Sequence, residues 1–334
     1  MSGNGSSIDP WGDFWMSKER ALGGGCLPTR WDGIEAPQRQ VWQEFARQLP
    51  KAAHVLDLAT GDGRVMGWLL GARRDLKPIG VDLAPQIPPP PKGSRSHAGI
   101  AMEKLPFGDS SRDAVTSQFG FEYGDAVGVL REIARVLKPG GRIGLMTHRL
   151  DGPILEHNRP RREGLLWVLD EIGLIAKARA SLALRALVPG VPSEIRAASH
   201  EAQRRFGAGS AGWELAEATF QTLALGRNDH PRNILELLET LEAKARNEIG
   251  RIDSLEVACR SVADQLGVER RFGEAELQVE SHRLVKEAGG GRPFADMWIL
   301  RKAAASLRPR HCLESKKGRR TEVRRPSFSP GPPA

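Results

Sequence analysis

The sequence predicts an α/β protein with a doubly wound, mostly parallel sheet and a helical insertion before the last two strands. Between residues 53 and 148, short apolar runs typical of buried strands alternate with helical patterns. Residues 151–270 carry helical patterns and no strand signal. Strand patterns return at 275–285 and 295–301. The helical block is therefore expected to interrupt one sheet.

The first expected element is an N-terminal arm, residues 1–34, that is rich in Gly and Ser but contains Trp11, Phe14 and Trp15. Aromatic side chains dominate burial, so the arm would either pack on the body or fold over a site. Residues 35–48 follow with apolar residues at helical spacing, which predicts a helix.

A core that binds a cofactor is expected over residues 35–150. Strands are predicted at 54–59, 78–81, near 97–101, 113–120 and 142–147, with helices near 64–73 and 125–137. The prolines between 85 and 91 forbid a regular helix there. Lys138 to Gly141 (Lys-Pro-Gly-Gly) should form a turn that ends the second helix.

The helical insertion is expected over residues 151–270, and its clearest helix at 232–249. That helix carries an apolar stripe of Ile234, Leu237, Leu238, Leu241 and Ala245. Further helices are predicted at 164–187 and 212–225. The block would form a lid over a substrate, or else support a dimer or pad the core. Residues 271–303 should supply the last strands of the core sheet.

The charge of the chain is concentrated at one end. The 334 residues contain 49 Lys and Arg against 41 Asp and Glu, a net charge of +8, and residues 301–334 account for all of it. Residues 304–334 are also Pro/Ser-rich with few apolar residues, which is typical of a disordered tail. The tail would make a weak contact with nucleic acid or an anionic surface, or be dispensable. A neutral body disfavours nucleic acid as the main partner.

Composition excludes several other classes. The chain is 40% hydrophobic and 27% charged, as globular proteins are, and no apolar run approaches the roughly 18–20 residues that span a bilayer. The first residues lack the layout of a signal peptide, so we expect a cytoplasmic protein without membrane insertion. Cys26, Cys259 and Cys312 are far apart and odd in number, which argues against a disulfide framework or a metal site.

The first strand leads into a glycine turn, Asp57-Leu-Ala59-Thr-Gly61-Asp-Gly63. At the carboxyl edge of a parallel sheet such a turn binds nucleotide-like ligands, because the backbone can approach closely. The NAD fingerprint needs a third glycine where Met66 stands, so an oxidoreductase is disfavoured. Asp57 suits a cationic amine or a ribose better than a pyrophosphate. Asp82, after the second strand, suits the two ribose hydroxyls of any adenosine ligand.

Three further segments narrow the ligand: Ala101 to Asp113 around Leu-Pro-Phe, Ser117 to Tyr123, and Leu130 to Gly141. In order and together with the glycine turn, over residues 53–148, they resemble the class I S-adenosylmethionine-dependent methyltransferases of the type 11, quinone-biosynthesis-like branch. The resemblance implies a Rossmann-like methyltransferase fold with S-adenosyl-L-methionine as cofactor.

The resemblance also implies cofactor contacts. The glycine loop would approach the methionine and ribose, Asp82 the ribose hydroxyls, the stretch before Leu-Pro-Phe the adenine, and the end of the fourth strand the methyl group. The matching residues are Asp57, Ala59, Gly61, Gly63, Asp82, Met102, Glu103, Ser117, Gln118 and Phe119. Ala59 replaces the first glycine of the loop, which we expect to be harmless.

Candidates for a base or a substrate clamp follow the fourth and fifth strands: Glu122, Tyr123, His148 and Arg149. A histidine at a strand end suits general-base work, although it could also only hydrogen-bond a loop. The expected reaction is methyl transfer to an O, N or C atom of a small, moderately hydrophobic metabolite. Methylation of RNA or protein, and a non-catalytic scaffold with this fold, stay open as alternatives. The sequence does not fix the oligomeric state.

Overall fold

The computed structural model describes Trp11 and residues 32–183, 185 and 190–304. The expectations for Phe14 and Trp15 in the arm, and for the tail beyond residue 304, lie outside these described residues. Among the described helices, none combines the length and the apolar character needed to cross a bilayer.

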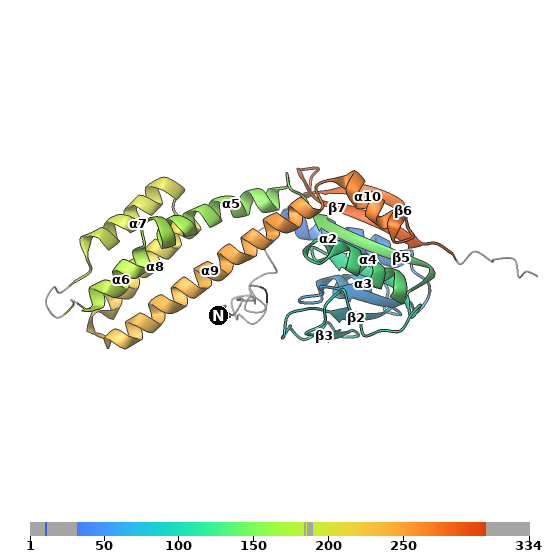
Figure 1. Cartoon of the computed structure of the whole chain (residues 1–334), viewed down its shortest axis with the longest axis horizontal. Helices are drawn as coiled ribbons and strands as arrows, with labels where there is room; N and C mark the ends of the chain where they lie inside the picture. Colours follow the sequence, from blue (N-terminus) through green and yellow to red (C-terminus); the bar gives the residue numbers. More distant parts are fainter. Residues whose placement is uncertain (1–10, 12–31, 184, 186–189, 305–334) are drawn as a thin grey trace, which may run out of the picture. The chain divides into compact units, whose positions relative to one another are not determined.

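The described residues form one seven-stranded sheet, which confirms the predicted fold class. Its strands are β1 (His54–Leu58), β2 (Lys77–Val81), β3 (Arg95–His97), β4 (Arg112–Gln118), β5 (Leu137–His148), β6 (Leu277–Lys286) and β7 (Pro293–Lys302). Their order is β3-β2-β1-β4-β5-β7-β6 (Figure 1). The first five strands pair in parallel, whereas β7 is antiparallel to both of its neighbours.

Helices cover both faces of the sheet, as in a doubly wound fold. Apolar side chains of α2 (Asp32–Arg47) and α3 (Arg64–Ala72) share one buried cluster, to which Trp42 and Phe45 contribute. Those of α4 (Ala126–Val136) and α10 (Gln265–Glu274) share a second cluster with Trp298 of β7. Removal of these side chains from water is the main contribution to the stability of the core.

The order of strands reverses direction between β1 and β4, because the chain first builds β1, β2 and β3 and then returns to pair β4 with β1. The loops after β1 and β4 therefore diverge at this point. In open parallel sheets a ligand binds in the crevice outside the carboxyl ends of the strands where this reversal occurs.

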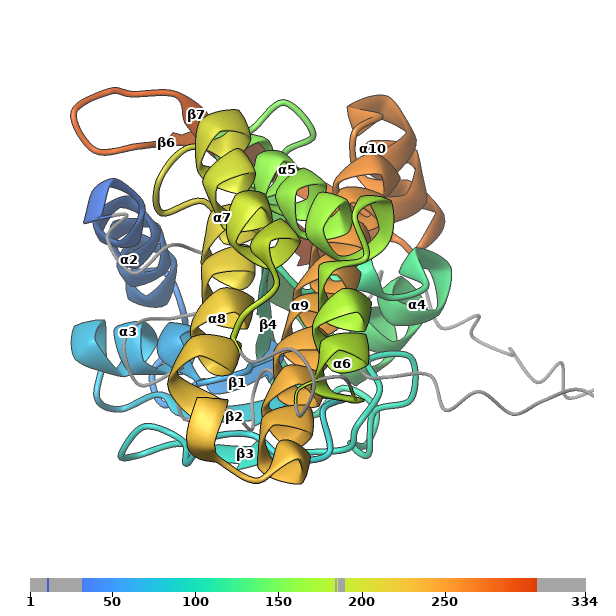
Figure 2. The same ribbon diagram turned by 90° about the vertical axis from the view of Figure 1, so that its left-hand side faces the viewer.

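Between β5 and β6 the chain forms a group of helices (Figure 2). This group has an apolar cluster of its own. The elements are α5 (Pro153–Leu166), a π-helical turn at Trp167–Glu171, α6 (Leu174–Ala183), α7 (Ser193–Phe206), α8 (Ala211–Leu225), a 3₁₀ turn at Gly226–Asn228 and α9 (Pro231–Ser261). The cluster includes Val168, Ile195, Ala216 and Leu238, which are fully buried. These helices thus stabilise one another by packing.

Two strands differ from their expected limits. β3 occupies 95–97 rather than 97–101, because its residues pair with Ile79–Val81 of β2. β5 starts at Leu137 and includes the segment Lys138–Gly141, but the pairing with β4 passes from Leu137 directly to Arg142 and Gly140 has φ +75°, so the predicted turn is a bulge within the strand. Leu137 is fully buried and pairs with Arg112 of β4, and this pairing holds the chain extended directly after α4.

Two helices also differ. The predicted helix 164–187 is interrupted at Gly173, whose φ of +60° is incompatible with a right-handed helix. The predicted helix 232–249 is part of the longer α9. Leu237, placed on the inner stripe by its spacing, is 54% exposed, while Ile234 and Leu238 are fully buried. A shift of the buried stripe by one residue is enough to expose Leu237, because successive helical residues lie 100° apart.

Candidate functional site

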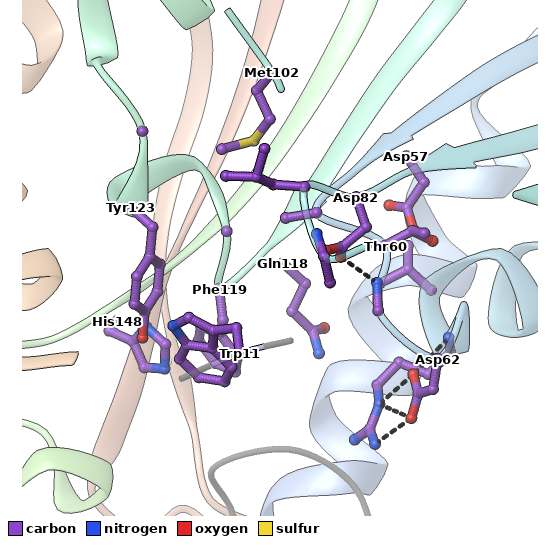
Figure 3. A pocket seen from close by; sticks show the side chains of 18 of the residues that line it. Trp11, Asp57, Thr60, Asp62, Asp82, Met102, Gln118, Phe119, Tyr123 and His148 are labelled. Atoms are coloured by element: carbon purple, nitrogen blue, oxygen red, sulfur yellow. Dashed lines mark hydrogen bonds and ion pairs between the residues drawn. The ribbon is translucent and has the colours of Figure 1, made fainter. Parts of the chain in front are cut away.

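A pocket lies at the carboxyl ends of β1, β2, β4 and β5, at the point where the strand order reverses (Figure 3). It is lined by Trp11, Asp57, Ala59, Thr60, Gly61, Asp62, Arg64, Val65, Asp82, Leu83, Ala84, Met102, Glu103, Gln118, Phe119, Gly120, Tyr123, Gly124 and His148. The carboxylates of Asp57, Asp62 and Asp82 lie on one side of the pocket, and the aromatic rings lie on the other (Figure 3).

The glycine turn after β1 is shaped by backbone conformations that favour glycine. Gly61 and Gly63 have φ values of +51° and +73°. A Cβ on Gly63 would lie 2.7 Å from Pro91 Cδ, so the proline-rich loop packs directly against the turn. Ala59 also has a positive φ of +51°. Its replacement of the first glycine therefore carries a backbone cost that the sequence alone did not reveal, roughly 1 kcal/mol.

Asp82 at the end of β2 holds the turn in place. Its Oδ2 accepts a hydrogen bond from the Gly61 backbone N–H at 2.9 Å, and its Oδ1 accepts one from the Ala84 N–H at 3.0 Å. The side chain is largely buried but lines the pocket. Because an ionised carboxylate has about four lone-pair sites, Asp82 retains acceptor capacity for hydroxyl groups of a ligand.

Asp57 is a buried carboxyl group inside β1. It accepts hydrogen bonds from the hydroxyls of Thr60 (2.6 Å) and Thr116 (2.7 Å), which favour its ionised form. Burial acts in the opposite direction and outweighs them, so the pKa of Asp57 is raised to about 7. A cationic group bound in the pocket would favour the ionised carboxylate.

Met102 and Glu103 lie on the side of the pocket formed by the chain after β3. Met102 presents its flexible thioether to the cavity (Figure 3). Glu103 Oε1 accepts a hydrogen bond from the Asp125 N–H at 2.9 Å, and Asp125 in turn caps α4. Glu103 thus fixes the wall of the pocket and also faces it.

Gln118 at the end of β4 has its amide orientation fixed. The indole N–H of Trp42 is 2.6 Å from Gln118 Oε1. Since an indole N–H can only donate, the Gln118 oxygen must face Trp42. The Gln118 amide NH₂ is then available as a donor to a ligand in the pocket that this side chain lines.

Four rings form the other wall of the pocket. Phe119 stacks on His148 with centroids 4.0 Å apart, and Tyr123 meets His148 edge-on at 6.1 Å. Trp11 meets Tyr123 edge-on at 5.5 Å (Figure 3). Phe119 adopts φ +55°, an unusual conformation for a bulky residue, and its N–H donates to the Met146 carbonyl. Such backbone strain is found preferentially at functional sites.

Behind this wall, Glu122 binds His148 twice. Glu122 Oε1 is 2.8 Å from both the backbone N and the Nδ1 of His148. The Glu122 side chain is 0% exposed and the His148 side chain is 4% exposed. Glu122 itself does not line the pocket, so it acts on the site through the imidazole.

The pocket brings together most of the residues that the sequence singled out, whereas Gly63, Ser117 and Glu122 stand behind its surface. Ser117 is buried, and its hydroxyl donates to the Leu58 carbonyl and accepts from the Phe121 N–H. Arg149 lies outside, paired with Asp151 and Asp296. The pocket is also lined by residues that were not predicted from the sequence: Thr60, Asp62, Arg64, Val65, Leu83, Ala84, Gly120 and Gly124. These residues lie close in sequence to predicted ones, and that closeness was the signal that could have found them. For Trp11 the signal was the aromatic content of the arm.

The described residues contain no group of three or more His, Cys, Asp or Glu side chains arranged to hold a metal ion. The donor set of the pocket instead consists of separated carboxylates, one amide and aromatic rings. This fold and this site define a doubly wound domain that binds a nucleoside-type ligand at its strand reversal point.

The comparisons with known proteins identify the domain. Residues 56–145 match the family model described as a methyltransferase domain. This segment is similar to the class I S-adenosylmethionine-dependent methyltransferases, including quinone-biosynthesis enzymes.

Two curated proteins that the chain resembles are methyltransferases. A malonyl-[acyl-carrier protein] O-methyltransferase of Methylococcus capsulatus is 28% identical over 42% of this chain and 55% of its own length. A ubiquinone/menaquinone biosynthesis C-methyltransferase of Desulfotalea psychrophila is 36% identical over 31% of this chain and 46% of its own. A solved S-adenosylmethionine-dependent methyltransferase from Aquifex aeolicus is 12% identical with a TM-score of 0.41, over 83% and 94% of the two chains. The chain spans about half the length of the curated relatives it matches.

Proposed function

We propose that this protein transfers a methyl group from S-adenosyl-L-methionine to a small, moderately hydrophobic molecule. The observation that carries the proposal is the pair of carboxylates at the carboxyl ends of β1 and β2. Asp57 and Asp82 line one pocket next to the glycine turn, and Asp82 supports that turn through Gly61. An adenosine ligand with a cationic amino acid end matches this arrangement of charges.

The residues of the pocket fit this cofactor. Asp82 would hold the ribose hydroxyls, Asp57 the cationic amine, and Met102 and Glu103 the adenine. Gln118 and Phe119 would border the reacting end. When bound, the cofactor supplies a methyl group on a positively charged sulfur. The protein has to align the acceptor with that methyl group and exclude water.

The acceptor side is the aromatic wall, which favours a small molecule with an apolar body. A neutral body over residues 1–300 supports this acceptor class over RNA or an extended basic or acidic protein. Residues 151–270 remain our candidate for a cover on the acceptor side. A hydrogen bond joins α9 of this insertion to η2 (Phe121–Tyr123): the Ser261 hydroxyl donates to the Glu122 carbonyl at 3.1 Å.

Two measurements on the full chain test the proposal. Calorimetry should detect S-adenosylhomocysteine binding in the micromolar range and no NADH binding. A metabolite extract incubated with methyl-labelled S-adenosylmethionine should yield a labelled small molecule whose appearance requires the protein. Absence of S-adenosylhomocysteine binding at millimolar concentration would leave only a scaffold function for this fold. Label that appears in RNA or protein instead would move the acceptor to the alternative class.

A further inference from the structure

Glu122 and His148 make more contacts than a single hydrogen bond that fixes a loop. One oxygen, Glu122 Oε1, serves both the backbone N–H and the imidazole Nδ1 of His148, each at 2.8 Å. An ionised carboxylate only accepts hydrogen bonds, so Nδ1 must carry the proton in the neutral imidazole. The free lone pair of the ring is then on Nε2.

His148 lines the pocket, and among the described residues Nε2 has no hydrogen-bond partner. The plane of the ring is fixed because Phe119 stacks on it at 4.0 Å and Tyr123 contacts its edge. A base held with one nitrogen bound to a carboxylate and the other directed into a pocket is the arrangement that general-base catalysis needs.

Among the described residues, the Glu122 carboxylate is hydrogen-bonded to His148 alone. Its Oε2 is buried and lacks a hydrogen-bond partner among the described residues. The groups around the pair add little charge: Cys259 of α9 stays a neutral thiol, since burial raises its pKa to about 12. Arg149, directly after β5, pairs with Asp296 of β7 and with Asp151, and Asp296 also binds His282 of β6. On the pocket side, the other ionisable lining residues are Tyr123, Asp57, Asp62, Arg64, Asp82 and Glu103. Among the described residues, His148 is therefore the hydrogen-bond partner on which the Glu122 carboxylate depends.

We propose that His148 is the catalytic base of this site, that Glu122 is its positioning residue, and that the acceptor is a group that loses a proton on methylation. This rests on the proposed methyl transfer. As the acceptor atom forms its bond to the methyl carbon, the bond from that carbon to sulfur breaks and its electron pair stays on sulfur. The acceptor proton moves to His148 Nε2 and later passes to water.

The proposal selects a class of substrate. Hydroxyl, phenol and N–H groups, and carbon acids, are neutral before transfer and need a base. A carboxylate, which is already anionic, needs none, and a tertiary amine has no proton to lose. The acceptor expected here belongs to the first set, with an aromatic or similarly flat body that suits the wall formed by Phe119, Tyr123 and Trp11.

The first test reads the imidazole directly and requires no acceptor. The full chain is labelled with ¹⁵N-histidine, and His148→Asn assigns the resonances. We expect the Nδ1–H tautomer in the neutral ring of the wild type, and a loss of this preference in Glu122→Ala, which lacks the acceptor for Nδ1–H. The control variant His157→Gln should leave the tautomer of His148 unchanged. An Nε2–H tautomer in the wild type, or the same Nδ1–H preference in Glu122→Ala, would overturn the proposal.

The second test uses the labelled product of the extract experiment. An ether, an N-methyl product that has lost a proton, or a C-methyl product is expected; a methyl ester or a quaternary ammonium ion overturns the proposal. Glu122→Gln should lower kcat about 100-fold or more with KM within threefold. If Glu122→Gln fails to fold, His148→Ala with added imidazole replaces it: restored turnover supports the base, and its absence contradicts it.

Failure of the proposed function is distinguishable from failure of this inference. A protein that binds no S-adenosylhomocysteine lacks the function, whatever the state of its histidine. A protein that binds it but shows the wrong tautomer, or makes a methyl ester, has the function without the base.

Discussion

The carboxylate of Asp82 accepts a hydrogen bond from the backbone N–H of Gly61, with 2.9 Å between the two heavy atoms. The end of β2 is thereby fixed to the glycine turn after β1, and the second oxygen binds the Ala84 N–H. One side chain thus shapes the turn and offers its remaining lone pairs to the pocket.

Asp82→Asn should weaken S-adenosylhomocysteine binding about 100-fold. Both carboxylate oxygens accept backbone N–H groups, so either orientation of the amide places a donor against a donor. Loss of two charge-assisted hydrogen bonds to a ribose adds about 3 kcal/mol, which corresponds to that factor. Calorimetry measures this loss of affinity. Asp109→Asn is the matched control, because the Asp109 side chain is exposed. Equal affinities in the two variants would remove Asp82 from the site.

Asp57 should make both stability and ligand binding depend on pH. Burial raises its pKa from 3.8 to about 7, so the folded protein holds a proton that the unfolded chain has lost between these values. Its contribution to stability is therefore complete below about pH 4 and is lost as pH rises to 7, by about 1.4 kcal/mol per pH unit. The difference in unfolding free energy between wild type and Asp57→Asn isolates this slope from other carboxyl groups.

The same carboxyl group predicts the pH dependence of binding. A cationic amine favours ionised Asp57, so S-adenosylhomocysteine should bind several-fold more tightly at pH 8 than at pH 6. Calorimetry at the two pH values, on wild type and Asp57→Asn, measures the effect. A variant that keeps the wild-type pH dependence would assign it to another group.

Ala59→Gly should stabilise the protein by about 0.5–1 kcal/mol. Ala59 adopts φ +51°, which costs an L-residue roughly 1–2 kcal/mol, while glycine loses more chain entropy on folding and offsets part of the gain. Ala52→Gly is a matched comparison with φ +55° away from the pocket. Chemical denaturation should show a gain in both variants, whereas a loss at Ala59 would mean that its methyl group packs favourably.

Trp11→Ala should raise the KM for the acceptor about tenfold and change the affinity for S-adenosylhomocysteine less. Trp11 contacts Tyr123 on the same wall as His148, and burial of an aromatic ring against a flat ligand contributes about 0.5–1.5 kcal/mol beyond its buried area. Trp11→Phe, which keeps an aromatic ring, should restore most of the affinity. A larger effect on S-adenosylhomocysteine than on the acceptor would place Trp11 on the cofactor side.

The sequence by itself determined the fold class and the nature of the ligand pocket. Those features are local: the alternation of apolar runs, the glycine turn after Asp57, and an acid at the end of the next strand depend on residues close together in the chain. Parallel pairing then places the ends of β1, β2 and β4 at one edge, because every strand in such a pairing points the same way. The predicted ribose acid therefore lies beside the glycine turn that it follows by some twenty residues.

Only the tertiary structure decided how the side chains work in that pocket. The approach of Trp11 to Tyr123, the positive φ of Ala59, and the burial that raises the pKa of Asp57 depend on packing between segments distant in sequence. The same holds for Glu122 and His148: the spacing marks both as candidates, but the 2.8 Å contact that directs Nε2 outward arises where η2 packs against the end of β5. The periodicity of apolar residues in the sequence predicts which residues are buried. The direction of a buried polar side chain, in contrast, is set by its partner elsewhere in the fold.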